Sequence, residues 1–427
     1  MIGLLLFTIP LNGALFSRSA KLRHVYLTWQ NDPCRTITIN VHGINTPSKL
    51  TVYYDTQPRF SKISRYCHKA KGFGHQKIRL PDDRMIYHVE LKDLIPGTTY
   101  YFTVGDQSRS YCGEIRFRTV PGETGPLLFV EGGDWENTPA AEALAKKAAA
   151  LSPYAALLGG DYPSHVYGLG DYEKWDHWLD VYRRSMITPE GHLIPMVMAV
   201  GNHEVTGGFG QSKEKAPFFF HYFRQGNTKE SYFNLTIGER VSLFVLDSGH
   251  AAQHDGPQLE WFEEQLEKVK EVPIKIAIYH VPLFPSIRFA KKDLTYRTFY
   301  SAVELWKGRL VANKLYSSQS CQGRKYWLPL FDKYNFTACF EHHDQTLKRT
   351  KLIREGKEAI KGTVYLGDGG WGSEEQHPPL QGYFNNYFAA LQGKVHFFWA
   401  IEIDEDKITY VAMTPSGRVV DHFIQKR

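Results

Sequence analysis

The chain has 427 residues, which is long for a single domain and favours two. Its 51 Lys and Arg residues outnumber its 45 Asp and Glu residues, and the excess is scattered along the chain. Because there is no dense basic run, a nucleic-acid-binding protein is not expected. Beyond the N-terminal segment, no stretch approaches the ~20 consecutive apolar residues that a membrane-spanning helix needs.

The N-terminal segment differs from the rest of the chain in composition. An apolar run from Leu4 to Leu11 is followed by small residues, namely Gly13, Ala14, Ser19 and Ala20. This order resembles the apolar and cleavage regions of a secretory signal peptide, although no Lys or Arg precedes the run. We expect residues 1–20 to be a truncated signal peptide, with a buried first strand as the alternative. The protein is then expected to be secreted, or periplasmic if its source is bacterial.

The cysteines suit neither a disulfide framework nor a zinc ribbon, because they are few and irregularly spaced. They are Cys34, Cys67, Cys112, Cys321 and Cys339. In an oxidising compartment, two of the first three could form one bridge, and Cys321 and Cys339 another. Since the count is odd, at least one buried free thiol is expected.

Residues 22–119 are expected to form short strands. Six segments alternate apolar and polar side chains at period two: residues 25–29, 36–41, 50–54, 87–91, 99–104 and 114–118. Turn residues separate them and no stretch has a sustained helical period, so a β-sandwich is predicted. The stretch from Leu94 to Tyr100 resembles the tyrosine corner of fibronectin type III domains, in which the tyrosine hydroxyl bonds to upstream backbone.

A turn-rich stretch, residues 120–126, predicts a linker, and the pattern changes after it. Apolar runs at residues 127–130, 155–158, 195–200 and 275–279 alternate with helix-like segments that include residues 140–151 and 257–272. The last of these has Asp255 as a candidate cap and one apolar face. Repetition of strand, polar loop and helix predicts an α/β layered domain that binds ligands at the strand ends.

Five short polar pieces follow in one order along this second part. They are Gly133-Asp134-Trp135, Gly160-Asp161, Gly201-Asn202-His203-Glu204, Tyr279-His280 and His342-His343-Asp344-Gln345. Carboxylate, amide and imidazole groups together suit zinc, iron, manganese or nickel ions. Each piece alone has an ordinary explanation, such as a turn or a core histidine. Their shared order and context favour a hydrolytic metal site.

Within this set, Asp161 is expected to bridge two metal ions. A bridging carboxylate holds two cations ~3.5–4 Å apart in two-metal hydrolases, where they act together on the phosphoryl oxygens. Asp134 would bind the first ion, and Asn202 would offer a neutral oxygen to the second. His280 and His343 would add imidazole nitrogen to the second ion.

The loop of Asn202 also supplies candidates for catalysis. His203 is placed to stabilise charge in the transition state or to protonate a leaving group. Glu204 is expected to orient His203 and to fix its tautomer. Arg288, which follows the loop of His280, is a candidate phosphate contact, with a solvated surface arginine as the alternative.

The ordered motifs resemble the calcineurin-like metallophosphoesterase superfamily and, within it, the purple acid phosphatases. The pattern of that superfamily runs Asp-x-Gly/His, Gly-Asp, Gly-Asn-His-Glu/Asp, a lone His and Gly-His-x-His. The loop from His280 to Phe284 and the turn from Gly367 to Gly372 also look like this family. The resemblance implies an α/β (α+β) four-layer metallophosphoesterase β-sandwich, flanked by helices, over residues 126–427. It implies an all-β fibronectin-III-like sandwich over residues 21–120.

Three departures from the family's pattern concern the first metal site. Purple acid phosphatases place a tyrosine that binds ferric iron three residues after the bridging aspartate, where this chain has Ser164. Glu136 replaces the usual glycine two residues after Asp134, and Gln345 stands in place of the second histidine. We expect the second site to be complete and the first to be altered, with Gln345 as a poorer ligand. A purple ferric centre is therefore not expected.

The resemblance implies metal-dependent hydrolysis of phosphate esters by a metal-activated hydroxide, as in an acid-phosphatase-like phosphomonoesterase. The cofactors are expected to be two ions of Fe, Zn or Mn, with Glu136 or His165 helping to complete the first site, or one ion alone. The modest positive charge suits a small phosphate-ester substrate. The alternatives are a phosphodiesterase and a catalytically impaired pseudo-phosphatase that acts as a binding protein. The sequence does not fix the oligomeric state.

Overall fold

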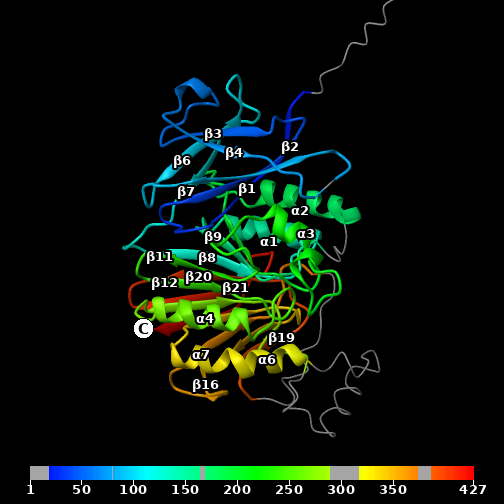
Figure 1. Ribbon diagram of the computed structural model, residues 1–427. Helices are drawn as coiled ribbons and strands as arrows, with labels where there is room; N and C mark the ends of the chain where they lie inside the picture. Colours follow the sequence, from blue (N-terminus) through cyan, green and yellow to red (C-terminus); the bar gives the residue numbers. More distant parts are fainter. Residues whose placement is uncertain (1–18, 79, 164–168, 289–316, 374–385) are drawn as a thin grey trace, which may run out of the picture.

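An all-β N-terminal part is stacked on a larger part built from sheets and helices (Figure 1). The computed structural model describes residues 19–78, 80–163, 169–288, 317–373 and 386–427. Most of the expected signal peptide lies outside these ranges, as do Ser164 and His165. Within these ranges, no helix is both long enough and apolar enough to cross a membrane.

Two antiparallel sheets form the N-terminal part. One contains β1 (Lys21–Thr28), β2 (Ile37–Ile44) and β5 (Met85–Leu91), and the other contains β4 (His68–Phe73), β3 (Lys49–Asp55), β6 (Thr99–Gly105) and β7 (Ile115–Arg118), each in spatial order. Their alternating apolar residues, such as Ile39 and Phe102, are fully buried in a shared core. The tyrosine corner is present, because the backbone N–H of Ile95 donates to the hydroxyl of Tyr100 at 2.9 Å.

Two larger sheets form the second part. The first has the order β10 (Met196–Met198), β9 (Ala155–Leu158), β8 (Leu127–Gly132), β20 (Phe398–Ile403), β21 (Lys407–Met413) and β22 (Val419–Lys426). The second has the order β11 (Phe233–Ile237), β12 (Val241–Val245), β13 (Ile274–Ile278), β14 (Ala338–Glu341), β18 (Val364–Gly367), β15 (Leu347–Thr350) and β19 (Phe388–Gln392). A short hairpin, β16 (Ile353–Arg354) with β17 (Lys357–Glu358), stands apart from both.

Helices cover the outer faces of these sheets and complete four layers (Figure 1). On the face toward the N-terminal part lie α1 (Pro139–Ala149), α2 (Tyr172–Ser185) and α3 (Pro217–Tyr222). On the opposite face lie α4 (Pro257–Lys268), α6 (Ser318–Tyr326) and α7 (Leu328–Lys333). Between the sheets, residues such as Leu157, Ile276 and Phe340 are buried in one apolar core. The fold is therefore the four-layer β-sandwich that the sequence predicted.

A buried ion pair ties the two parts together. Arg84, the residue directly before β5, is 1% exposed and donates through Nη2 to the carboxylate of Asp176 in α2 at 2.7 Å. His24 of β1 approaches the same carboxylate, with 2.8 Å between Nε2 and Oδ1. Breaking a buried pair leaves an uncompensated charge, so these contacts hold the sandwich against α2.

The parallel strands decide where a ligand site can form. Strands β8, β9 and β10 run parallel to one another, as do β12, β13, β14 and β18 in the other sheet. The loops that carry the polar motifs all leave the carboxyl ends of these strands. Ligands bind at such ends in open α/β sheets, which brings the five motifs to one edge of the molecule.

Some local predictions differ from the structure. The second helix-like segment ends at Lys268 rather than at residue 272, and its N-cap is Gly256 rather than Asp255. The five cysteines are all free thiols, so neither candidate disulfide is formed. Cys339 is fully buried within β14, and burial raises the pKa of its thiol well above the ordinary value. It therefore behaves as a small core residue.

Candidate metal centre

Four donor atoms from four loops converge at the carboxyl ends of the central strands. Nε2 of His280 lies 3.0 Å from Oδ2 of Asp161, 3.2 Å from Oδ1 of Asn202 and 3.1 Å from Nδ1 of His343. The ligand atoms of Asp161, His280 and His343 all lie within 4.8 Å of one another. Bonds from nitrogen or oxygen to a transition metal are about 2 Å long, so a cluster of this size fits one ion.

A backbone hydrogen bond fixes the orientation of the His280 imidazole. Its Nδ1 donates to the backbone carbonyl of Gly159 at 2.9 Å, so Nε2 faces the cluster. Such hydrogen bonds to the second ring nitrogen orient metal-binding histidines. The ring is fully buried, so it has little freedom to leave this position.

The charges in the cluster favour a cation. Burial acts to lower the pKa of His280, but the carboxylate of Asp161 outweighs it and raises that pKa to about 9. Burial opposes ionisation of Asp161, yet His280 and then His203 hold its pKa well below the ordinary value. A proton on His280 therefore balances the buried carboxylate here, in a position that a metal ion could take over.

The side expected to hold the first ion is built differently. Oδ2 of Asp134 accepts from the backbone N–H of His343 at 3.1 Å, and Oδ1 accepts from Nε2 of Gln345 at 3.2 Å. Burial raises the pKa of Asp134 to about 7. Oε1 of Gln345 is buried without a hydrogen-bond partner among the atoms that the structure places. A buried acceptor of this kind is costly, and a cation beside it would satisfy it.

Glu204 has a different task from the one expected of it. Its Oε2 accepts from the backbone N–H groups of Gly201 at 2.7 Å and of Asp161 at 3.0 Å, and its Oε1 accepts from that of Tyr162 at 2.7 Å. The carboxylate thus braces the turn that presents Asp161. Burial and then the charge of Asp161 raise the pKa of Glu204 to about 8.

His203 faces the same cluster from the other side of Asp161. Its backbone N–H donates to Oδ1 of Asp161 at 2.8 Å, and its ring Nε2 lies 3.8 Å from Oδ2. The side chain retains 14% of its exposure, in contrast to the fully buried His280. A partly exposed imidazole at this edge is available to an incoming substrate.

Glycines make room for the ligand loops. A Cβ atom on Gly159 would lie 1.5 Å from the ring of His342, and one on Gly133 would lie 2.8 Å from it. His342 replaces the glycine of the family pattern, so these two glycines accommodate its ring. Gly369 has a φ of 78°, and a Cβ there would lie 2.0 Å from Oδ2 of Asp134.

Four residues of the site have a strained backbone. Asp134, Asp161, His343 and Gln345 have φ values of 54°, 56°, 74° and 54°. Residues with side chains rarely adopt this left-handed region, and they cluster at functional sites when they do. The turns they form aim the side chains back over the strand ends.

A fully buried ion cluster lies beneath the loops of His280 and His343. Nζ of Lys348 lies 2.6 Å from Oε2 of Glu341 and 3.1 Å from Oδ2 of Asp368, and it donates to the carbonyl of Phe284 at 2.6 Å. Burial acts to lower the pKa of Lys348, but Asp368 and Glu341 outweigh it and raise it. Glu341 also accepts from the backbone N–H of Leu283 at 2.6 Å. The cluster joins three segments that frame the candidate metal ligands.

Two further side chains flank the donor atoms. The guanidinium of Arg288 forms an ion pair with the buried carboxylate of Asp344 and donates to the carbonyl of His343 at 3.4 Å. It is therefore anchored and is not a solvated surface arginine. The ring of Phe209 stacks on His250, with centroids 4.7 Å apart, and meets the ring of His343 edge-on at 6.2 Å.

Sequence reasoning missed Phe209, Lys348 and Glu341. Phe209 lies among glycines, and Gly208 and Gly210 on either side have φ values of 75° and 67°. This glycine-rich stretch directly after Glu204 was the available signal for a shaped loop. Lys348 and Glu341 gave no comparable signal, because only tertiary contacts bring them together.

Comparison with known proteins adds family information to this geometry. A family model described as the N-terminal domain of purple acid phosphatase matches residues 22–119. A second, described as calcineurin-like phosphoesterase, matches residues 126–313. Together they cover most of the chain, in the order that the sequence motifs indicated.

Individual relatives agree with these matches. The chain is 29% identical to purple acid phosphatase 1 of Ipomoea batatas, over 47% of this chain and 44% of that protein. It is 23% identical to acid phosphatase type 7 of Homo sapiens, over 98% of this chain and 94% of that protein. The structure of a purple acid phosphatase from yellow lupin (Lupinus luteus) seeds superposes with a TM-score of 0.71 at 17% identity. That match covers 94% of this chain and 74% of the lupin chain, and it shows a shared fold.

Proposed function

The chain belongs to the calcineurin-like phosphoesterases and carries the N-terminal domain of purple acid phosphatases, and from this premise we propose that it is a metal-dependent hydrolase of phosphate esters. The convergence of Asp161, Asn202, His280 and His343 carries the proposal. The set combines one carboxylate, one amide oxygen and two imidazoles, with Asp161 and His280 buried, and such donors suit a transition-metal ion.

The donor atoms support one strongly bound ion and a second that binds more weakly. The strongly bound ion would have four donors, from Asp161, Asn202, His280 and His343. The other ion would rely on Asp134, Asp161 and the amide oxygen of Gln345, and an amide oxygen is a poorer ligand than the imidazole that the family pattern has there. Zinc, manganese and iron all suit the complete donor set.

When bound, a metal ion would lower the pKa of a water molecule and stabilise negative charge on the phosphoryl oxygens. Arg288, anchored by Asp344, would add a fixed positive charge beside the site for the same oxygens. His203 would protonate the leaving oxygen, since its partly exposed ring lies at the mouth of the cluster. The hydrogen bonds from Glu204 would keep Asp161 in place while this happens.

The wall formed by Phe209 favours a phosphate monoester with a flat, apolar leaving group. Its ring is fixed against His250 and lies next to His343, so an aromatic leaving group would pack against it. A phosphodiester needs room for a second ester group, and that choice depends on loops outside the motifs. We therefore rank monoesters first and diesters second.

A binding protein without catalysis is the second candidate, and one observation favours it. Gln345 donates to Asp134, so a hydrogen bond occupies the oxygen that would otherwise bind the first ion.

Secretion also stays a prediction. The segment that would direct it lies mostly outside the described ranges, and the five free thiols do not add support from disulfides.

The test is hydrolysis of an aryl phosphate and of a bis-aryl phosphate diester, with added zinc or manganese. His280→Ala and Asp161→Asn are expected to reduce kcat/KM by about 10³-fold or more, because the metal contributes several kcal/mol to the transition state. His177→Ala, an exposed histidine of α2, is the matched control and is expected to leave the rate unchanged. Equal rates in the wild type and in His280→Ala would refute the proposal.

A further inference from the structure

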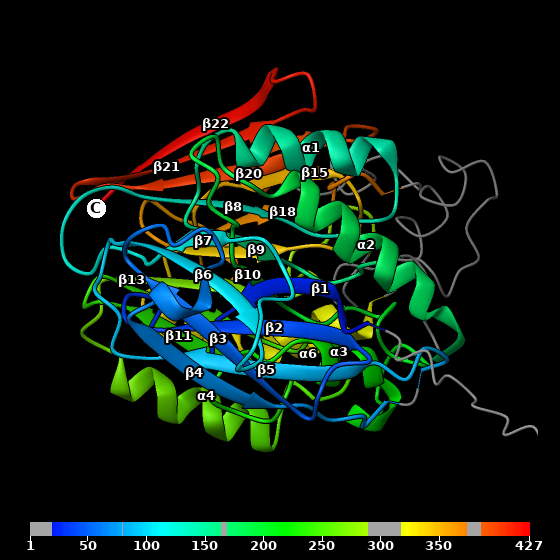
Figure 2. The same ribbon diagram turned by 90° about the horizontal axis from the view of Figure 1, so that it is seen from above.

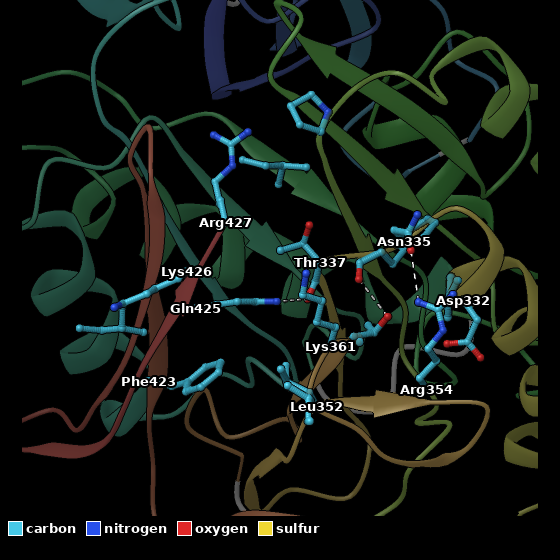
Figure 3. A pocket seen from close by; sticks show the side chains of 18 residues that line it. Asp332, Asn335, Thr337, Leu352, Arg354, Lys361, Phe423, Gln425, Lys426 and Arg427 are labelled. Atoms are coloured by element: carbon cyan, nitrogen blue, oxygen red, sulfur yellow. Dashed lines mark hydrogen bonds between the residues drawn. The ribbon is translucent and has the colours of Figure 1, made fainter.

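A groove of about 760 Å³ lies far from the ligand loops (Figure 3). Its wall includes Ile274, Thr337 and Thr363, which stand at or just before the amino ends of β13, β14 and β18. His280 and His343 follow the carboxyl ends of β13 and β14, the opposite ends of these strands, so the groove is not part of the candidate metal centre. The end of β22 forms its other wall.

The groove is strongly basic for its size. Four basic residues and one acidic residue line it, namely Arg354, Lys361, Lys426 and Arg427 against Asp332. Among the residues that the structure describes, no carboxylate forms an ion pair with Lys361 or Lys426. Arg354 donates to the side chain of Asn335 at 3.4 Å rather than to an acid. An excess of positive charge around a concave surface attracts an oppositely charged ligand.

The same groove exposes apolar side chains. Ile360 is 95% exposed and Ile424 is 47% exposed, and both line the groove. Leu352 and Phe423, both half-buried, also line it (Figure 3). An apolar surface with a charged rim is the usual anatomy of a binding site rather than of ordinary surface.

A free sheet edge borders the groove. Among the strands that the structure describes, β22 is the outermost of its sheet and pairs with β21 alone (Figure 2). The backbone N–H of Arg427 donates to the carbonyl of Asp406, the residue before β21. The backbone N–H groups of successive residues in an antiparallel strand point to opposite sides, so the N–H of Ile424, three residues earlier, points away from β21. Edge strands with unpaired backbone groups can accept another strand unless something protects them.

We propose that this groove binds an extended acidic peptide, which adds to β22 as a further strand. Backbone hydrogen bonds to β22 would supply affinity, as in other cases of strand addition. Alternate side chains of the peptide would lie against Leu352 and Phe423, while its acidic residues would meet Lys361 and Lys426. A second copy of the chain is a poorer occupant, because it would bring the same positive charge to the groove. The proposal does not depend on the hydrolase activity.

The test uses a fluorescein-labelled peptide of alternating Glu and Val, as long as the 8 residues of β22, in fluorescence anisotropy titrations at low salt. Saturable binding is expected. It should weaken about tenfold in the Lys361→Glu, Lys426→Glu double variant, since each lost rim pair costs about threefold. Lys69→Glu, an exposed lysine of β4, is the matched control and should bind like the wild type.

Two further arms separate strand addition from simple charge attraction. A peptide N-methylated at alternate residues keeps its charge but loses its backbone donors, and it should bind much more weakly. Ile424→Pro removes an N–H that points away from the sheet and should weaken binding of the unmodified peptide in the same way.

Three results would overturn the proposal. The first is the absence of saturable binding up to ~1 mM peptide, which is the weak limit of useful affinity. The second is that the N-methylated peptide binds the protein as tightly as the unmodified peptide does. The third is that the double variant binds the unmodified peptide as tightly as the wild type does. Sedimentation of the protein alone provides a further check. A dimer that Ile424→Pro dissociates would assign the edge to a second copy of the chain instead.

Discussion

Replacing Lys348 with methionine should lower the stability of the protein strongly. The ammonium group is fully buried, as are its partners Glu341 and Asp368. Methionine keeps most of the volume but removes the charge, and two carboxylates then remain buried without a cation. Removal of one partner from a buried ion pair costs about 3–5 kcal/mol. In a domain of this size, each kcal/mol lowers Tm by roughly 2–4 °C, so a fall of about 6–20 °C is expected.

The assay is thermal unfolding followed by circular dichroism, beside the matched variant Lys351→Met. Lys351 pairs with Glu358 at the surface, with both side chains at least 36% exposed, so its loss should cost at most about 1 kcal/mol. Adding Glu341→Gln to Lys348→Met should restore part of the lost stability, because it removes one of the stranded charges. If Lys348→Met unfolds at the same temperature as Lys351→Met, the buried cluster does not brace the loops and this reasoning is wrong.

Two other changes test the site and the core. Gly369→Ala should lower the free energy of unfolding by at least about 1–2 kcal/mol, since a left-handed backbone is costly for alanine. The added Cβ atom should also displace the carboxylate of Asp134. The assay is urea unfolding, and the control is Gly113→Ala, whose Cβ atom would meet no atom within 4 Å. Burial lowers the pKa of His254 to about 3, so between pH 6.5 and pH 5 only the unfolded chain takes up its proton and stability falls by about 2 kcal/mol. His254→Leu should remove this part of the pH dependence, and an unchanged difference between pH 7 and pH 5 would contradict the assignment.

The strands with one buried face were predictable, and those without one were not. β6 and β9 begin where the alternating or continuous apolar runs begin, because core packing imposes that pattern. β4 was missed, since its six residues are mostly exposed and only Gly72 is buried. An edge strand of this kind carries no apolar period. Its partner β3 specifies it through backbone hydrogen bonds.

The convergence of the candidate ligands could be predicted, whereas the groups that support them could not. Asp161 and His280 follow apolar strands directly, so the sequence places them at strand ends. The contact between Lys348 and Glu341 depends on how β14 and β15 pack around the loop of Leu283, and no local pattern encodes that. The expectation for Glu204 had the right loop but the wrong partner, because three backbone N–H groups compete successfully for its carboxylate.

The central claim is that Asp161, Asn202, His280 and His343 form a complete ion site beside one weakened by Gln345. It is tested most directly by elemental analysis of the wild type and of Gln345→His, each incubated with zinc and then freed of loosely bound ions. We predict one retained ion per wild-type chain and two in Gln345→His, because imidazole replaces an amide oxygen as ligand. Retention of no ion by the wild type, or the same ion count in both proteins, would contradict the account.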